Sequence, residues 1–152
     1  MPKGSEELTL ARREEIVNAC AALYETMGFK EITIRDIGEK TSFTRTSIYN
    51  YFQTKEEIFL ALFQREYETW REDLEAVLHG HDRMSIEEFS DALARTLERR
   101  ELLLKLLSVN LYDMEANSRM ERLVAFKTAY GDSMGAVTRC LEKFFPRMTD
   151  ED

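Results

Sequence analysis

Apolar residues recur every three or four positions along most of the chain, which is the spacing of one face of an α-helix. Five long segments show this stripe: residues 10–27, 56–78, 85–98, 102–114 and 118–144. Two shorter segments, at about 34–40 and 45–51, show it over one or two turns. No segment alternates apolar and polar residues as a half-buried strand does. The pattern therefore predicts an all-α fold of seven helices.

Hydroxyl residues mark where these helices begin, because a Ser or Thr side chain accepts a hydrogen bond from a free backbone N–H of the first turn. Four pairs have capping-box spacing: Thr33 with Asp36, Thr54 with Glu57, Ser85 with Glu88, and Ser118 with Glu121. Thr44 is expected to cap the helix at 45–51. Gly28 is expected just beyond the end of the first helix, and Pro146 ends the last one.

Composition agrees with a helical protein that is exposed to water. The chain has 152 residues, of which 33% are charged, and only six glycines and two prolines interrupt it. A chain of this length forms one domain or two lobes that share a core. It lacks an apolar run of the roughly 20 residues that span a bilayer. Residues 1–15 lack the apolar segment of a signal peptide, so a cytoplasmic location is expected.

Few residues are candidates for a catalytic, redox or metal-binding role. Cys20 and Cys140 lie on apolar helical stripes and are expected to be buried free thiols. His79 and His81 flank a glycine in a polar connector with no cysteine cluster nearby, so no metal site is expected. No phosphate-binding loop, dinucleotide fingerprint or nucleophile motif occurs. The sequence indicates neither an enzyme nor a cofactor.

Charge is unevenly distributed. The formal net charge is −8, which argues against coating of nucleic acid by the whole surface. Residues 30–55 nevertheless contain five basic and three acidic side chains, so this segment is net positive while the remainder is strongly acidic. A contact with nucleic acid is therefore expected in this segment.

The stretch TSFTRTSIYNYFQTKEE, residues 41–57, lies in this basic segment. Two short helices followed by a longer one predict a helix-turn-helix. The helix at 45–51 is too short to be stable alone, so Ile48 and Phe52 are expected to hold it from its inner side. Its hydroxyl, amide and guanidinium groups then face outward, where they suit phosphates and base edges.

The run TIRDIGEKTSFTRTSIYNYFQTKEEIFLAL, residues 33–62, resembles the DNA-binding segment of the TetR (tetracycline repressor) family of bacterial transcription regulators. The resemblance implies that four residues contact bases: Arg35, Arg45, Thr46 and Asn50. It implies phosphate contacts from six more: Thr33, Thr44, Ser47, Tyr49, Tyr51 and Lys55. Alternatively, Tyr49 and Tyr51 are packing residues and Arg45 is a solvated charge. Ser42 stands where the family commonly has Gly, so a left-handed conformation there would cost about 1 kcal/mol.

The resemblance also implies a head at residues 1–56 and a regulatory domain at 57–152 whose helices enclose a ligand; in the family, two further helices at the end of this domain form a dimer. Nine apolar or aromatic residues are candidates for the pocket, although such stripes are also typical of plain core: Tyr67, Trp70, Phe89, Leu93, Leu107, Leu111, Phe126, Tyr130 and Met134. Thr149 has the position of a further helix cap. The chain is therefore expected to be a fragment or a shortened member lacking the dimerisation helices, with exposed apolar residues on the helices at 102–114 and 118–144.

Two functions follow from these observations. The first is a cytoplasmic homodimeric repressor, without a membrane partner, that leaves a palindromic operator in double-stranded DNA when a small-molecule effector binds. The second is a helical adaptor whose helix-turn-helix binds a protein, which the acidity outside residues 30–55 favours.

Overall fold

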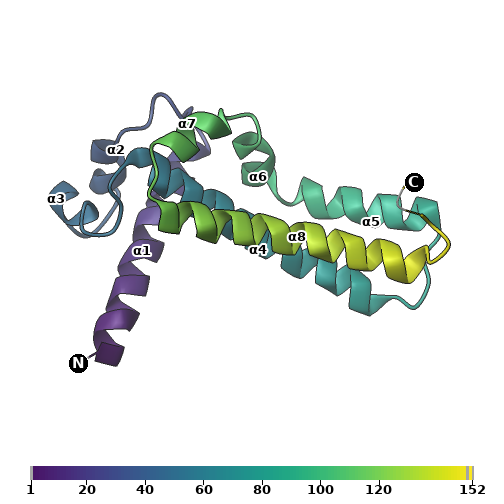
Figure 1. Ribbon diagram of the computed structural model, residues 1–152. Coiled ribbons are helices and arrows are strands. Elements are labelled where there is room, and N and C mark those ends of the chain that lie inside the picture. Colours follow the sequence, from purple (N-terminus) through teal and green to yellow (C-terminus); the bar gives the residue numbers. More distant parts are fainter. Residues whose placement is uncertain (1, 150, 152) are drawn as a thin grey trace.

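The computed structural model describes residues 2–149 and 151, with side chains from residue 4 onward. This part of the chain forms α-helices and no β-strand (Figure 1). The helices are α1 (Pro2–Tyr24), α2 (Ile34–Glu39), α3 (Arg45–Ile48), α4 (Lys55–Gly80), α5 (Ile86–Glu98), α6 (Glu101–Leu106), α7 (Leu111–Ala116) and α8 (Met120–Phe144). The all-α prediction is confirmed.

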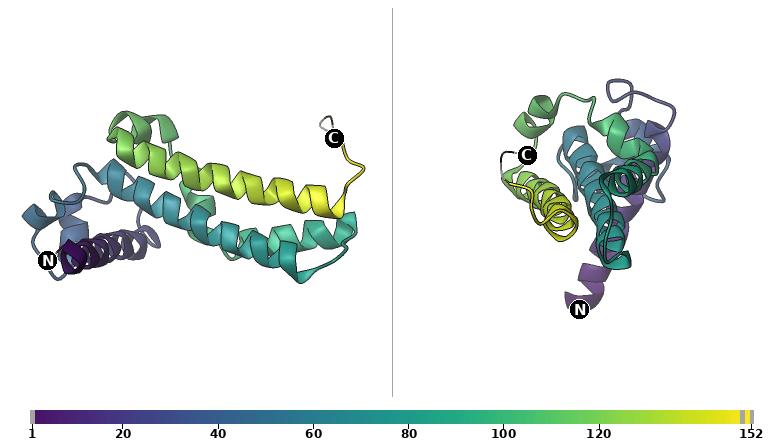
Figure 2. Two further views of the ribbon diagram at one scale, coloured as in Figure 1. Left: turned by 60° about the horizontal axis from the view of Figure 1, so that its bottom comes forward. Right: turned by 90° about the vertical axis from the view of Figure 1, so that its right-hand side faces the viewer.

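Helices α4 and α8 lie side by side and run in the same direction (Figures 1 and 2). Their contacts keep a constant offset in sequence: the Ser133 hydroxyl donates to the Tyr67 carbonyl oxygen (2.9 Å), and the Cys140 thiol to that of Leu74 (3.8 Å). Ala136 is fully buried between these contacts. Small residues on α8 thus allow the two long helices to pack closely along their length.

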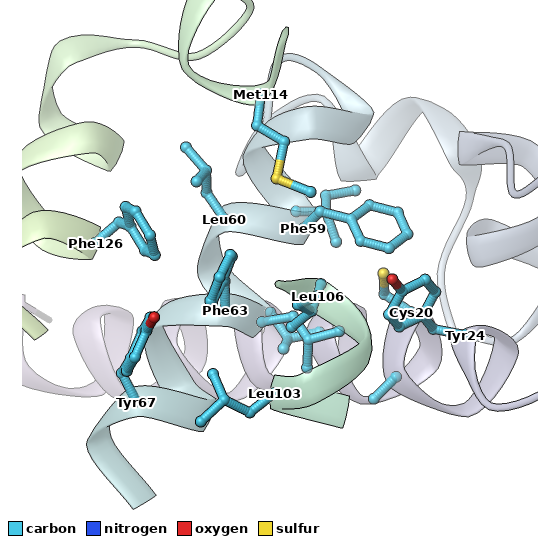
Figure 3. Close-up of a cluster of buried hydrophobic side chains, with 14 of the residues drawn as sticks. Cys20, Tyr24, Phe59, Leu60, Phe63, Tyr67, Leu103, Leu106, Met114 and Phe126 are labelled. Atoms are coloured by element: carbon cyan, nitrogen blue, oxygen red, sulfur yellow. The ribbon is translucent and has the colours of Figure 1, made fainter. Parts of the chain in front are cut away.

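One hydrophobic core runs from the head into the regulatory helices. Figure 3 shows the part of it where α1, α4, α6, α7 and α8 meet, with side chains that include Cys20, Tyr24, Phe59, Phe63, Leu103, Leu106, Met114 and Phe126. A second cluster lies at the far end of α4 and α8, made of Leu78, Met84, Phe89, Cys140 and Phe144. Because α4 contributes to both clusters, it joins the head rigidly to the rest of the molecule.

Several local predictions are confirmed. Thr33 and Asp36 form a reciprocal capping box, with N···O distances of 3.1 and 3.0 Å. Thr44, Thr54 and Ser85 each accept the expected backbone hydrogen bond. The two cysteines are free and buried.

The helix expected at 102–114 is instead two helices, so this prediction is wrong. The Ser108 hydroxyl donates to the Lys105 carbonyl oxygen (2.6 Å), and Asn110 caps α7 by accepting from the Tyr112 amide (3.1 Å). Both side chains compete with the helical backbone for its hydrogen-bonding groups, which interrupts the helix at residues 107–110.

The cap expected at Ser118 is also wrong. Its hydroxyl donates back to the Met114 carbonyl oxygen (2.7 Å), and α8 begins one residue later with Arg119 at the N-cap. No side chain caps this helix start. A long-range ion pair of Arg119, described below, sets the boundary in place of a local cap.

The first helix differs from the expectation at both ends, because it begins at Pro2 and ends at Tyr24, before Gly28. Among the described residues neither a glycine nor any other residue has a positive φ. Ser42 therefore carries none of the left-handed strain expected for it. The described helices also include none that is both long and apolar enough to cross a membrane.

Candidate nucleic-acid interface

The recognition helix α3 is a single turn that the core holds from one side. Ile48 is fully buried and Phe52, just beyond the helix, is 1% exposed, as expected. The chain continues past Ile48 as hydrogen-bonded turns, with the Tyr51 amide donating to the Ile48 carbonyl oxygen (2.9 Å). Packing and not propensity therefore keeps this turn in place.

The opposite face of α3 is open to solvent. Arg45, Thr46 and Asn50 are exposed, and Tyr49 is 45% exposed. Arg45 and Tyr49 are four positions apart, as are Thr46 and Asn50, so each pair lies on neighbouring parts of one helical surface. The structure thus brings together three of the four predicted base-contacting residues on one protruding surface.

Arg35, the fourth of these residues, projects from α2. Its guanidinium forms an exposed ion pair with Glu39 one turn later (3.3 Å). Such pairs are worth about 0–1 kcal/mol, so the guanidinium is readily exchanged to another anion. Arg35 therefore stays available to DNA, although it lies on a different helix from the other three.

The predicted phosphate-contacting hydroxyls are already partly engaged within the head. The Thr33 hydroxyl oxygen accepts from the Asp36 amide, while Thr44 and Ser47 share one hydrogen bond between their hydroxyls (3.0 Å). Hydrogen bonds from the Thr33 amide and side chain hold the pKa of Asp36 below its ordinary value. One of the Thr44 and Ser47 hydroxyls therefore keeps its hydrogen to donate, while Thr33 would have to exchange its bond with Asp36 for one to a phosphate.

Tyr51 and Lys55 are the phosphate candidates with most contacts inside the protein. The Tyr51 side chain is half-buried and its ring meets that of Phe43 edge-on, at 6.3 Å between centroids. The Lys55 ammonium donates to the carbonyl oxygen of Phe29 (2.7 Å). These contacts favour the packing alternative for the Tyr51 ring and give Lys55 a structural partner.

Helix α1 anchors the turn between α2 and α3, a contact that the sequence did not reveal. The Ser42 amide donates to the Glu15 carboxylate (2.5 Å), and the Arg12 guanidinium lies 5.2 Å from the centroid of the Phe43 ring. Hydrogen bonds with Ser42 lower the pKa of Glu15. The turn is thus fixed by residues 27 positions away, which no local pattern predicts.

The nine candidate pocket residues do not converge on one cavity. Three are buried in the main core (Tyr67, Trp70 and Phe126), three pack against it (Leu93, Leu111 and Met134), one lies in the far cluster (Phe89), and two are exposed (Leu107 and Tyr130). In the core, the Tyr67 and Phe126 rings lie 6.0 Å apart and the Trp70 indole donates to the Thr96 hydroxyl (2.9 Å). Leu107 and Tyr130 are 55% and 46% exposed, although the Tyr130 ring meets that of Tyr67 edge-on at 5.4 Å between centroids.

A groove of about 490 Å³ does lie between α4 and α5, on the outer side of the Trp70–Thr96 contact. None of the nine candidates lines it. Its walls combine charged and apolar side chains, among them Asp73, Val77, Met84, Asp91, Arg95 and Thr96. The sequence does not indicate this groove, because its lining mixes charged and apolar side chains from α4, α5 and the connector between them.

Two family comparisons divide the chain within α4. Residues 16–62 match the description "Bacterial regulatory proteins, tetR family", and residues 64–152 match "Tetracyclin repressor-like, C-terminal domain". The chain belongs to the TetR family. The family's two parts therefore meet inside one continuous helix of this TetR-family protein, a few residues after the boundary expected at 56/57.

Two curated relatives are similar to parts of the chain. The uncharacterized HTH-type transcriptional regulator YfiR of Bacillus subtilis is 32% identical over 63 residues, which is 41% of this chain and 31% of that protein. The HTH-type transcriptional repressor Rv1474c of Mycobacterium tuberculosis is 29% identical over 103 residues, which is 64% of this chain and 54% of that protein. The chain thus spans about a third and about half of the lengths of these relatives.

Proposed function

We propose that this TetR-family protein is a transcriptional regulator that binds double-stranded operator DNA and represses transcription until a small-molecule effector releases it. The observation that carries the proposal is the division of α3 into a buried and an open side. Ile48 fixes the helix to the core, while Arg45, Thr46 and Asn50 are free to reach base edges. A helix held in this way suits the major groove, which admits one α-helix.

The regulator is proposed to act as a homodimer on a palindromic operator in the bacterial cytoplasm. A one-turn recognition helix contacts few base pairs, and two half-sites lie about 34–36 Å apart or at multiples of that distance. Six large apolar side chains on α6, α7 and α8 or directly after α6 are between 45% and 76% exposed: Leu104, Leu107, Tyr112, Met120, Val124 and Tyr130. This exposure supports burial against a second protein surface.

The effector is proposed to bind among the regulatory helices. The support is the family assignment of residues 64–152 together with the groove between α4 and α5, whose volume suits a small molecule. Binding there would act on α4, the helix that continues into the head. A thermal-shift screen of small molecules tests this part, and a ligand is expected to raise the unfolding temperature increasingly as its concentration exceeds its Kd.

A gel shift with the DNA upstream of the gene tests the function as a whole. The protein is expected to prefer this DNA over a shuffled sequence of the same composition, with log K falling linearly as log salt rises from 50 to 200 mM. The matched control is Arg139→Met, on the exposed surface of α8 far from the head, which should bind like the wild type.

The acidic surface outside residues 30–55 supports a second candidate function, a helical adaptor that binds a protein. The same gel shift separates the two. Absence of binding at 50 mM salt would contradict the repressor proposal and favour the adaptor, because even non-specific DNA binding is strong at low salt.

A further inference from the structure

Glu57 is a fully buried carboxylate whose hydrogen-bond partners extend beyond the start of its own helix. It lies in the first turn of α4, where Thr54 already accepts from the Glu57 amide (3.1 Å). Its side chain is 0% exposed and both carboxylate oxygens are satisfied. Removing a charged carboxylate from water costs free energy, so Glu57 needs a source of compensating charge and hydrogen bonds beyond the local helix.

That source is Arg119, which directly precedes α8. Its backbone amide and Nε donate to Glu57 Oε2 (2.8 and 2.9 Å), and its Nη2 donates to Oε1 (2.9 Å). The Gln53 amide supplies the fourth hydrogen bond to the carboxylate (2.9 Å). Burial alone would raise the pKa of Glu57, but the Arg119 side chain and the two amides outweigh it and lower the pKa to about 2. The pair is therefore charged at neutral pH.

The same segment also holds the end of the recognition turn. Arg119 Nη2 lies 3.3 Å from the Tyr51 carbonyl oxygen, and the Thr54 hydroxyl donates to the carbonyl oxygen of Asn117 (2.8 Å). In the first turn of α8, the Arg122 guanidinium lies 5.0 Å from the centroid of the Phe52 ring. We call residues 117–122 the junction. It contacts the chain at Tyr51, Phe52 and Thr54, immediately after α3.

The junction therefore sits where a movement of α8 would reach the DNA-binding surface. Helix α8 packs against α4 from the junction to the far cluster, where Phe144 lies 6.0 Å from Phe89 of α5. An opening of the helices at that far end would tilt α8 against α4. Through the contacts of the junction, such a tilt would displace residues 51–54.

We propose that Arg119 is a positioning residue that ties the start of α8 to the end of the recognition helix through Glu57 in the first turn of α4, and so couples α8 to DNA binding directly at the head. This inference rests on the proposed DNA-binding function. Glu57 anchors the arginine, whose Nη2 also contacts the Tyr51 carbonyl oxygen and whose Nη1 pairs with Glu121 (3.0 Å). Loss of the tie leaves fewer contacts between the junction and residues 51–54, among them the Thr54–Asn117 hydrogen bond and the Arg122–Phe52 contact.

The test uses Arg119→Met, which keeps length and removes charge, and the double variant Glu57→Gln/Arg119→Met, which also removes the unpaired carboxylate. Hydrogen exchange of the amides of residues 49–54 is compared with that of residues 16–24 in α1. The expected result is exchange faster by on the order of tenfold in 49–54 in both variants, beyond any change in 16–24. Arg139→Met, which breaks an exposed ion pair elsewhere on α8, should change neither segment.

DNA affinity is measured on the same samples, under conditions in which each variant is fully folded. Both variants are expected to bind operator DNA on the order of tenfold more weakly. Equal acceleration in the two segments, or a double variant that binds and exchanges like the wild type, would overturn the proposal, because Arg119 would then only stabilise the fold. If Arg119→Met does not fold, Arg119→Lys is judged by the same two criteria.

Loss of the DNA-binding function and loss of the positioning role give different experimental results. A wild-type protein that does not bind DNA contradicts the proposed function, while the exchange difference still decides whether Arg119 positions residues 49–54. A protein that binds DNA but shows no selective exchange in Arg119→Met contradicts the positioning role alone.

Discussion

The ammonium of Lys55 donates a 2.7 Å hydrogen bond to the carbonyl oxygen of Phe29 and lies 4.3 Å from the centroid of the Phe29 ring. One residue thus joins the start of α4 to the loop between α1 and α2. A lysine ammonium carries three N–H donors, so two remain after the bond to Phe29. Lys55 combines an anchoring role in the head with the charge that a phosphate contact requires.

Lys55→Gln is expected to weaken binding to all DNA sequences alike, because the phosphate backbone carries no sequence information. The slope of log K against log salt should fall in magnitude by about 0.9 for each head that loses one phosphate contact. Lys127→Gln is the matched control, since Lys127 pairs with Glu115 away from the head (3.3 Å). An unchanged slope in Lys55→Gln would mean that Lys55 only anchors the loop.

Arg45→Ala and Tyr49→Phe are expected to differ in kind. Arg45 is exposed at the start of α3, and its loss should cost about 1–3 kcal/mol of binding and relax specificity at one operator position. Tyr49→Phe removes one hydroxyl and should weaken specific and non-specific binding equally. Competition with a set of operator variants measures both effects. If Arg45→Ala leaves the ranking of the variants intact, the base-reading role is wrong.

Local signals in the sequence predicted most helix boundaries. Thr33 and Asp36 lie three residues apart, and such a pair forms its capping box from neighbouring backbone alone. Ile48 was predicted to be buried from the periodicity of the short helix, and it is. The prediction that Ser118 caps α8 was wrong, because a contact between Arg119 and Glu57, 62 positions apart, determined where this helix begins. A buried carboxylate needed the amide of Arg119, and that need outweighed the local capping preference of a serine.

In the candidate DNA-binding site, too, the sequence predicts the residues whose position depends on local spacing and not those fixed by distant contacts. The exposure of Arg45, Thr46 and Asn50 follows from helical spacing around Ile48. The packing of Tyr51 depends on the turn between α2 and α3, which is itself fixed by α1, so no spacing within residues 41–57 indicates it. Most of the nine candidate pocket residues belong to the core and do not line a pocket, because α4 packs closely on α8.

Thr96→Val tests the buried contact beneath the groove between α4 and α5. Thr96 is 4% exposed and accepts a 2.9 Å hydrogen bond from the Trp70 indole, so valine leaves a buried N–H without a partner. The free energy of unfolding should fall by about 1–3 kcal/mol, as measured by urea denaturation. Thr128→Val, at an exposed position of α8, should change it by less than about 0.5 kcal/mol. Equal effects in the two variants would show that the indole N–H contributes nothing.

Low pH should reduce the free energy of unfolding of the protein, because Glu57 becomes protonated. Its pKa lies at about 2 in the folded state against an ordinary value of 4.5, so the folded protein binds fewer protons than the unfolded chain between these values. The stabilisation by Glu57 is therefore complete above pH 4.5 and is lost as the pH falls towards 2. The difference in free energy of unfolding between the wild type and Glu57→Gln should shrink by about 3 kcal/mol over this range. Phe52→Leu removes buried volume beside the same junction without a titrating group, so its difference from the wild type should stay constant with pH. Urea denaturation at pH values from 2 to 7 measures both differences, and a constant difference for Glu57→Gln would show that the pair with Arg119 does not hold the carboxylate ionised.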